Sequence, residues 1–354
     1  MCGTGPAGQG VPRGGLDPAC DPAHAKRMEQ ADAVVIGAGP AGLMAAERLA
    51  AAGAAVIVAE AMPTAGRKFL MAGKSGLNLT KDELPDAFLA AYGDAAGWLA
   101  PMLRAFGPRE VCAWAEGLGQ PVFTGSSGRV FPVAMKASPL LRAWLARLAA
   151  AGVTLRTRWR WQGWDGAGRL AFATPDGAVT LAARRTVLAL GGASWARLGS
   201  DGAWAGLLAA RGVPLAPFRP ANMGLGMAWS DRMPPLFGAP VKGVALCAAG
   251  RRVRAEFVIS HRGLEGGGIY AVAAPVRDGA ALTLDLIPDL DAGTAAARLA
   301  ARPAGESTAN RLRKALRLDP ARSALLRECH GGPLPRDPAA LERVAFNRFH
   351  NPPP

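Results

Sequence analysis

Short apolar runs separated by glycine-rich turns mark the first part of the chain. Residues 33–36 and 55–59 are apolar runs of the length typical of buried strands, and the alanine- and leucine-rich residues 43–52 between them favour a helix. Strand, helix and strand in this order predict an α/β fold with a parallel sheet. Further helices are predicted at 97–106, 108–118 and 138–151.

After Gly152 the pattern changes to short strands. Residues 153–164, 169–174 and 178–182 are separated by turns that contain Asp-Gly, which predicts a three-stranded antiparallel meander. Residues 186–190 form another buried run, which ends at Gly191 and Gly192. The first part of the chain is therefore predicted to combine a parallel sheet with a β-meander.

Prolines punctuate the chain from Pro214 onward, where a second domain is predicted to begin. Residues 263–270 are predicted to be a glycine-rich turn followed by a strand, and 294–328 to be mostly helical. Further strands are predicted at 241–248, 253–260 and 281–286. This pattern is typical of a strand-rich α+β domain.

These patterns divide the chain into four segments. Residues 1–27 are rich in Gly, Pro and Ala without periodicity and are predicted to be a disordered leader. Residues 28–213 are predicted to form the first domain, and residues 214–335 an inserted substrate domain. Residues 336–354, which end in FHNPPP, are interpreted as an aberrant or truncated tail.

Composition excludes several classes of protein. Half of the 354 residues are apolar and 19% are charged, which excludes a disordered chain. The longest apolar stretch, residues 34–59, contains Glu47 and Arg48, so no membrane-spanning helix is predicted. The five cysteines are scattered without a CxxC pair, and there are four histidines. We therefore expect no disulfide framework, no metal site and a cytoplasmic location.

The net charge of +14 suggests either a polyanionic partner or a biased composition. The arginines are dispersed, and their abundance together with Ala, Gly and Pro is typical of a GC-rich genome. We therefore expect neither a nucleic-acid nor a membrane partner. The predicted partner is a small-molecule substrate, and the oligomeric state is left open.

The most informative segment directly follows the first strand. Gly37, Gly39 and Gly42 form a G-x-G-x-x-G motif, and the second strand closes with Glu60. The first glycine permits a tight turn, the second lets the backbone approach a diphosphate, and the third lets helix and strand pack closely. An acidic residue at this spacing can accept hydrogen bonds from a ribose. The segment predicts a dinucleotide site.

Several motifs together resemble the BaiN-like family of bacterial NAD(P)/FAD-dependent flavoproteins, over residues 30–330. They read VVIGAGPAGLMAA, GRKFLMAGKSGLNLT, GRVFPVAMKAS, LALGGASWARLGSDGAWA, GLEGGGIYA and ESTANRLRKALRL. Wider members have G-G-G-R-C-N where this chain has G-K-S-G-L-N, so the chain resembles a divergent subgroup. It also lacks the C-terminal strand and helix with which family members contact the flavin.

The resemblance implies a Rossmann-like FAD-binding domain with an inserted substrate domain, and NAD(P)H as a candidate electron donor. It implies that the glycine motif holds the diphosphate, that the end of the second strand holds the ribose, and that the following loop lines the phosphates and isoalloxazine. A backbone contact to adenine is implied at Trp161. The implied cofactor-binding residues are Gly37, Gly39, Pro40, Ala41, Gly42, Glu60, Ala61, Gly66, Arg67, Lys68, Ser75, Gly76, Asn78, Trp161, Gly191 and Gly192.

Three functions stay open at this point. The first is an FAD-dependent oxidoreductase that acts on an unidentified small organic substrate. The second is a truncated, non-catalytic flavoprotein remnant, and the third is a tRNA-associated flavoprotein. Cys247, His261, Arg262 and Glu265 could face a substrate, but each is more often structural in such positions, so no catalytic residue is nominated.

Overall fold

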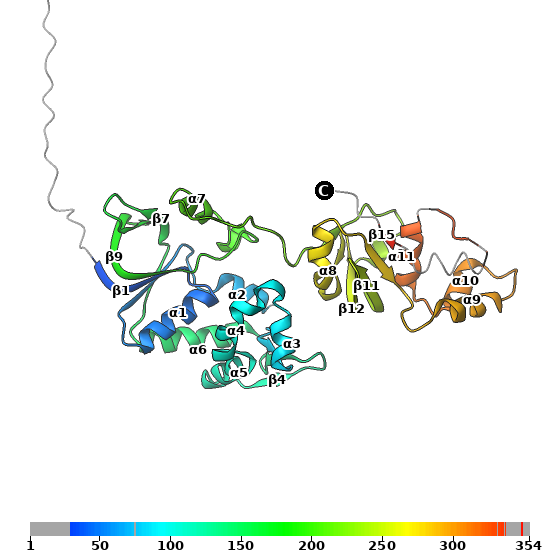
Figure 1. The fold of residues 1–354 in the computed structure, drawn as a ribbon, viewed down its shortest axis with the longest axis horizontal. Helices are drawn as coiled ribbons and strands as arrows, with labels where there is room; N and C mark the ends of the chain where they lie inside the picture. Colours follow the sequence, from blue (N-terminus) through cyan, green and yellow to red (C-terminus); the bar gives the residue numbers. More distant parts are fainter. Residues whose placement is uncertain (1–28, 74–75, 331, 336, 338–347, 350–354) are drawn as a thin grey trace, which may run out of the picture. The chain divides into compact units, whose positions relative to one another are not determined.

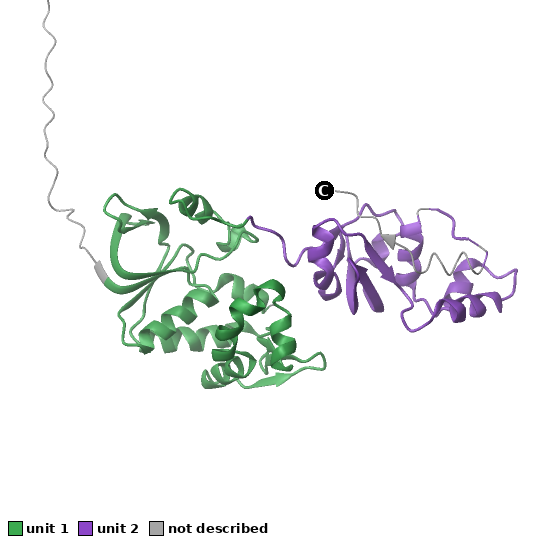
Figure 2. Ribbon diagram, viewed as in Figure 1, with its two compact units in different colours: residues 1–216 green, residues 217–354 purple. Residues whose placement is uncertain are grey.

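The computed structural model describes residues 29–73, 76–330, 332–335, 337 and 348–349 (Figure 1). The chain divides into two compact units, residues 1–216 and residues 217–354 (Figure 2). This division falls after Ala216, whereas the proline pattern predicts it after residue 213. The predicted leader, and all of the predicted tail except Asp337 and residues 348–349, lie outside the described residues.

Unit 1 is built on a six-stranded sheet. Its strands, in spatial order, are β6 (Thr154–Thr157), β2 (Val56–Glu60), β1 (Glu29–Ile36), β9 (Gly177–Leu188), β8 (Leu170–Thr174) and β7 (Arg160–Trp164). The first four pair in parallel, and the last three form an antiparallel meander. The predicted Rossmann-like class, a parallel sheet with a β-meander, is confirmed.

Two predicted strand boundaries in this unit are wrong. The predicted strand 153–164 is two strands, because Arg158 adopts a φ of 59° and turns the chain from β6 into β7. The turn is held by hydrogen bonds from the Arg158 amide to the Met62 carbonyl (3.2 Å) and from the Trp159 amide to the Glu60 carbonyl (2.8 Å). Conversely, the predicted strands 178–182 and 186–190 are the single strand β9, which pairs with β8 and then with β1.

Helices cover the parallel part of the sheet, and a small sheet of order β3-β5-β4 lies among them. These elements are α1 (Pro40–Ala51), α2 (Arg67–Ala72), β3 (Thr80–Lys81), α3 (Pro85–Ala90), η2 (Gly93–Ala95), α4 (Ala96–Ala105), α5 (Pro108–Gly117), β4 (Val122–Thr124), β5 (Arg129–Pro132) and α6 (Ala137–Ala150). Two short helices follow β9: η3 (Ala196–Leu198) and α7 (Trp204–Ala209).

The Glu47 side chain explains how a charge is accommodated within the apolar first helix. Its Oε2 accepts hydrogen bonds from the indoles of Trp114 (3.3 Å) and Trp144 (2.5 Å), and Arg147 lies 2.8 Å from Oε1. Trp144 is 2% exposed and belongs to the core cluster that α1 and α6 share. A part-buried carboxylate is tolerated here because donors surround it.

Unit 2 contains a second six-stranded sheet, of order β10-β13-β12-β11-β14-β15, and five helices in its described residues. The strands are β10 (Leu225–Gly226), β11 (Pro240–Ala248), β12 (Arg251–Ser260), β13 (Gly263–Glu265), β14 (Leu282–Asp285) and β15 (Arg348–Phe349). The helices are η4 (Pro234–Leu236), α8 (Gly267–Arg277), α9 (Ala292–Ala300), α10 (Thr308–Ala315) and α11 (Pro320–His330).

The strand predicted at the end of 263–270 is wrong, because α8 begins at Gly267. Ile269, Val272, Ala273 and Val276 are all buried, and this spacing of three and four places them on one helical face. That face packs on β11 and β12. The glycines before it are the turn from β13 into the helix, since Gly266 has a φ of 112°.

No helix among the described residues has the length and apolar character to cross a membrane. No group of three or more His, Cys, Asp and Glu side chains there could hold a metal ion.

Candidate functional site

A cavity of about 350 Å³ lies where the carboxyl ends of β1, β2 and β9 meet the N-terminus of α1. Ligands of open α/β sheets bind in the crevice at the carboxyl ends of parallel strands. The walls come from the glycine turn, the start of β7 and the loop between β9 and α7. The lining residues are Ile36, Gly37, Ala38, Gly39, Pro40, Ala59, Glu60, Ala61, Thr64, Gly66, Arg67, Lys68, Trp159, Arg160, Trp161, Gln162, Ala189, Leu190, Gly191, Leu198, Gly199, Ser200, Asp201, Ala203, Trp204 and Leu207.

The three motif glycines have different reasons to be glycine. A Cβ on Gly37, whose φ is +105°, would lie 2.3 Å from the Ala189 carbonyl oxygen, and one on Gly42 would lie 1.8 Å from the Gly37 oxygen. A Cβ on Gly39 would meet no protein atom within 4 Å, and its φ of −79° suits any residue. The fold therefore requires glycine at the first and third positions, whereas the open space at Gly39 belongs to the cavity.

Glu60 connects the glycine turn to the loop after β2. Its Oε2 accepts a hydrogen bond from the Ala38 amide, and its Oε1 accepts one from the Met62 amide, both at 2.8 Å. Each carboxylate oxygen retains further acceptor capacity, so the side chain can still receive a hydroxyl donor from the cavity. The carboxylate thus holds the cavity wall in place and presents acceptors to it.

Several donors at the cavity have no strong acceptor in the described part of the chain. The buried Nε of Arg67 and the buried Nε1 of Trp161 have no hydrogen-bond partner there. The ammonium of Lys68 donates to a neutral acceptor, the Ser194 hydroxyl, at 2.6 Å. A buried donor without an acceptor costs free energy, so these groups favour a ligand that brings anionic or carbonyl oxygens.

These features together fit the diphosphate of a dinucleotide. The N-terminus of α1 directs backbone N–H groups and the positive end of its dipole at the cavity, and Pro40 at the first helical position removes no needed donor. Arg67 and Lys68 add positive charge. The open space at Gly39 lets a ligand lie directly on the backbone.

Ten of the sixteen residues predicted for the cofactor line this cavity: Gly37, Gly39, Pro40, Glu60, Ala61, Gly66, Arg67, Lys68, Trp161 and Gly191. Five do not line it: Ala41, Gly42, Gly76, Asn78 and Gly192. Gly42 lies behind the turn, and the Gly192 carbonyl accepts a hydrogen bond from Ser200 Oγ. Ser75 lies outside the described residues.

Sequence reasoning missed two parts of the wall. Trp159, Arg160 and Gln162 flank Trp161 at the start of β7, and residues from the segment 198–204 form another part of the wall. Arg160 lies 3.3 Å from Asp201, which links the two parts. The sequence did contain a signal for the first part: Trp159, Trp161 and Trp164 lie within six positions of a predicted strand, and such an aromatic cluster could have indicated a binding surface.

The residues considered for substrate contact receive no role from the structure. His261, Arg262 and Glu265 are exposed at or beside the turn between β12 and β13. Cys247 lies in β11, where it pairs with Arg252 of β12. A different cysteine, Cys329, has a thiol whose pKa is raised by burial and by the nearby Glu328, which disfavours a reactive thiolate.

Comparison with known proteins places the chain among flavoproteins. The family described as HI0933-like protein Rossmann domain matches residues 31–318. A 3-dehydro-bile acid delta(4,6)-reductase of Clostridium scindens is 27% identical over 273 residues, which cover 73% of this chain and 65% of that protein. The chain therefore spans less than two thirds of that relative.

Two solved structures match part of the chain at low sequence identity. A 3-ketosteroid-delta4-(5alpha)-dehydrogenase of Rhodococcus jostii RHA1 is 20% identical with a TM-score of 0.37, covering 48% of this chain and 47% of that one. A flavocytochrome c3 fumarate reductase is 17% identical with a TM-score of 0.39, covering 61% of this chain and 47% of that one.

Proposed function

The chain belongs to the HI0933-like Rossmann-domain family of flavoproteins, and from this we propose that it binds FAD in the cavity of unit 1 as an oxidoreductase. FAD supplies hydride and electron transfer when bound. The expected substrate is a small organic molecule. NAD(P)H is the expected electron donor.

The open space at Gly39 is the observation that carries this proposal. The chain's own packing gives no reason for glycine there, because no protein atom lies within 4 Å of a Cβ at that position. A diphosphate lying on the backbone at the N-terminus of α1 supplies the reason. Glu60, the last residue of β2, lines the same cavity and accepts two backbone hydrogen bonds.

Each wall of the cavity has a part in this proposal. Arg67 and Lys68 neutralise phosphate charge, and Glu60 accepts from the ribose hydroxyls. Trp161 presents its unpartnered N–H, and Trp159 and Trp204 provide apolar surface for the nucleoside. The loop 198–204 excludes water from one side. Ala41 and Gly42 support the turn from behind, while Gly76, Asn78 and Gly192 lie outside this cavity.

The relative from Clostridium scindens suggests the kind of substrate. Its name describes a delta(4,6)-reductase that acts on a 3-dehydro-bile acid. We propose an apolar molecule with an activated double bond as the first class to assay for this chain.

Titration of the purified full chain with FAD tests the proposal. We expect saturable binding with a flavin absorbance band, and a loss of affinity of about 100-fold or more in Gly39→Val, because the side chain fills the phosphate space. Gly97→Val is the matched control, since Gly97 of α4 is equally open but lies outside the cavity. Equal affinity in the wild type and Gly39→Val contradicts the assignment. Bleaching of the bound flavin by NADH or NADPH tests the donor.

A further inference from the structure

A second cavity, of about 520 Å³, lies entirely within unit 2. Helices α10 and α11 form its sides, and the segment before η4 closes it. Three arginines from these three places line it: Arg232, Arg313 and Arg327. They are separated by up to 95 positions in the sequence, so only the fold brings them to one cavity.

Three arginines outnumber the two carboxylates that line this cavity, and both carboxylates contact other groups rather than these arginines. Asp319 accepts from the Arg322 amide (2.8 Å) and lies 3.0 Å from the Arg322 Nε. Glu328 accepts from the Ser230 amide and from the Ser230 hydroxyl, both at 2.7 Å. Neither carboxylate is hydrogen-bonded to one of the three arginines.

The three arginines form no ion pair with any residue that the structure describes. The one side-chain contact among them is from Arg313 to the Asn310 Oδ1, at 3.4 Å, which is long for a hydrogen bond. Arg232 and Arg313 are exposed and Arg327 is half-buried, so their guanidinium groups are accessible to an anion that enters the cavity from solvent.

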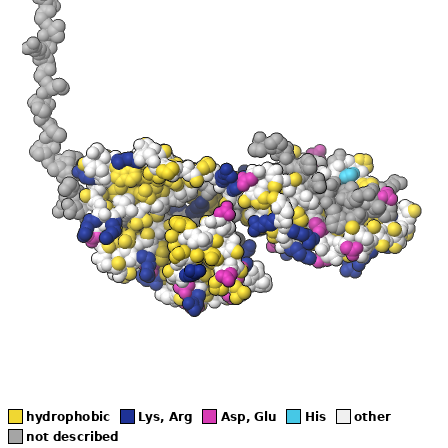
Figure 3. All heavy atoms as spheres, viewed as in Figure 1, with side chains coloured by type: hydrophobic (Ala, Val, Ile, Leu, Met, Phe, Trp, Pro, Cys, Tyr) yellow, Lys and Arg dark blue, Asp and Glu magenta, His cyan; other side chains and the backbone are white. Residues whose placement is uncertain are grey.

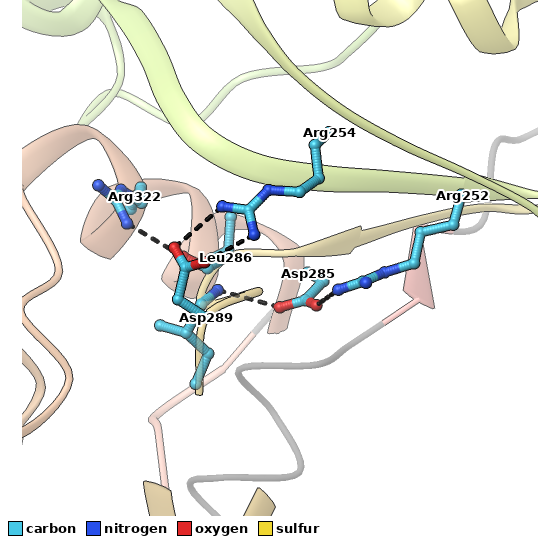
Figure 4. Close-up of polar contacts among 7 residues, drawn as sticks. Arg252, Arg254, Asp285, Leu286, Asp289 and Arg322 are labelled. Atoms are coloured by element: carbon cyan, nitrogen blue, oxygen red, sulfur yellow. Dashed lines mark hydrogen bonds and ion pairs between the residues drawn. The ribbon is translucent and has the colours of Figure 1, made fainter. Parts of the chain in front are cut away.

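Arginines elsewhere in unit 2 show that pairing is common in this unit. On the sheet, Arg252 lies 2.7 Å from Asp285, and Arg254 binds both oxygens of Asp289, at 2.6 and 2.9 Å (Figure 4). The hydrogen bonds to these carboxylates raise the pKa of both arginines. Arg322 extends the same cluster by donating to the Leu286 carbonyl at 3.1 Å. Other arginines of the unit, such as Arg298 and Arg317, also form no ion pair with a described residue, so the feature that distinguishes Arg232, Arg313 and Arg327 is that all three line one cavity.

We propose that this cavity binds a small anionic molecule through phosphate or carboxylate oxygens. The planar guanidinium groups of Arg232, Arg313 and Arg327 supply charged donors, and Asn310 and Ser323 supply neutral ones. Ala309, Pro320 and Ala324 contribute apolar surface, which suits a compact organic body.

The size of the cavity favours a small ligand over a polymer. Its volume of about 520 Å³ falls in the range of small-molecule pockets. On the face shown in Figure 3, Lys and Arg side chains are scattered over both units with Asp and Glu among them, rather than gathered in a stripe that could follow a nucleic-acid backbone. This site is independent of the flavin proposal, since it uses no residue of unit 1.

Isothermal titration of the full chain with inorganic pyrophosphate and, separately, with citrate tests the proposal at constant ionic strength. The double variant Arg313→Gln/Arg327→Gln should bind the preferred anion at least about tenfold more weakly, because each charge-assisted contact that is lost weakens binding. Arg298→Gln is the matched control, since Arg298 is an exposed arginine of α9 that does not line the cavity. It should bind like the wild type. The two titrants distinguish a phosphate ligand from a carboxylate ligand.

Three outcomes would overturn the proposal: no binding of either anion by the wild type at millimolar concentration, equal loss in Arg298→Gln, or unchanged binding by the folded double variant. Arg232→Gln serves as a second variant if the double variant does not fold by circular dichroism. FAD titration of the same variants should be unchanged, so failure of this site and failure of the flavin site can be told apart.

Discussion

The cavities of the two units are built on different principles. In unit 1 the backbone makes the site: a glycine turn, a helix N-terminus and a carboxylate fixed by two amides. In unit 2 side chains make it, because three arginines from separate segments line one cavity and form no ion pair with a described carboxylate. Backbone sites depend on local sequence, whereas side-chain sites depend on how distant elements pack.

This difference predicts where each cavity is vulnerable. A backbone site fails when a side chain is added. The new side chain either collides with protein atoms or occupies the space that the ligand needs. A side-chain site fails when a charge is removed while the fold remains intact. Four further changes, ordered from the largest expected effect to the smallest, test this comparison.

Gly42→Val should have the largest effect, because it acts on the fold itself. A Cβ there would lie 1.8 Å from the Gly37 carbonyl oxygen, and backbone cannot move aside cheaply. We expect unit 1 to be destabilised by more than the roughly 1–3 kcal/mol of ordinary overpacking. Chemical unfolding followed by circular dichroism measures it. A variant as stable as Gly39→Val would show that the turn is not closely packed.

Phe257→Ala should destabilise unit 2 by about 3–5 kcal/mol, as expected for truncation of a large buried aromatic residue. Phe257 is 1% exposed and lies in the core of that unit. The affinity for FAD should be unchanged, since the proposed site lies in unit 1. The measurement combines chemical unfolding with FAD titration. A parallel loss of FAD affinity would show that the two sites are coupled.

Glu60→Gln should weaken FAD binding by about tenfold, which corresponds to about 1.4 kcal/mol. The amide keeps one acceptor oxygen, but its NH₂ group then faces one of the two backbone donors, Ala38 or Met62. Glu265→Gln, at an exposed position in unit 2, is the control in the same FAD titration. A loss of FAD affinity in Glu60→Gln as large as that in Gly39→Val would contradict the assigned role of Glu60, which is to hold the cavity wall and to accept hydrogen bonds from the ribose.

The smallest expected effect is a pH dependence in unit 2. Hydrogen bonds from Arg302 and Lys314 lower the pKa of Glu306 to about 2 from 4.5. The folded state therefore binds this proton less readily than the unfolded state, so the stabilisation is complete above pH 4.5 and is lost as the pH falls towards 2. The difference in melting temperature between the wild type and Glu306→Gln should shrink from pH 6 to pH 3. A constant difference would contradict the ion pair.

Local sequence predicted most strands and helices of unit 1, because each is indicated by a pattern of residues that are close together in the chain. The apolar run before Gly37, the glycine spacing and Glu60 sufficed to predict strand, turn, helix and strand. Prediction was wrong at Arg158, where hydrogen bonds to the loop after β2 decide a turn that residue types alone do not show. It was also wrong at 267–270, which begins helix α8 rather than a strand. The buried positions have helical spacing, but which positions are buried is known only from the packing of the helix on the sheet.

The sequence by itself determined the Rossmann-like class and the backbone half of the unit 1 cavity, because both are encoded within about thirty neighbouring residues. It also determined the family, through motifs that are spread over residues 30–330. Only the tertiary structure decided which residues complete the walls. Trp159, Arg160 and the loop 198–204 join Gly39 in one cavity, and Arg232, Arg313 and Arg327 join in another. Which distant residues line one cavity depends on how segments far apart in the chain pack together. Hydrophobic periodicity does not encode this packing.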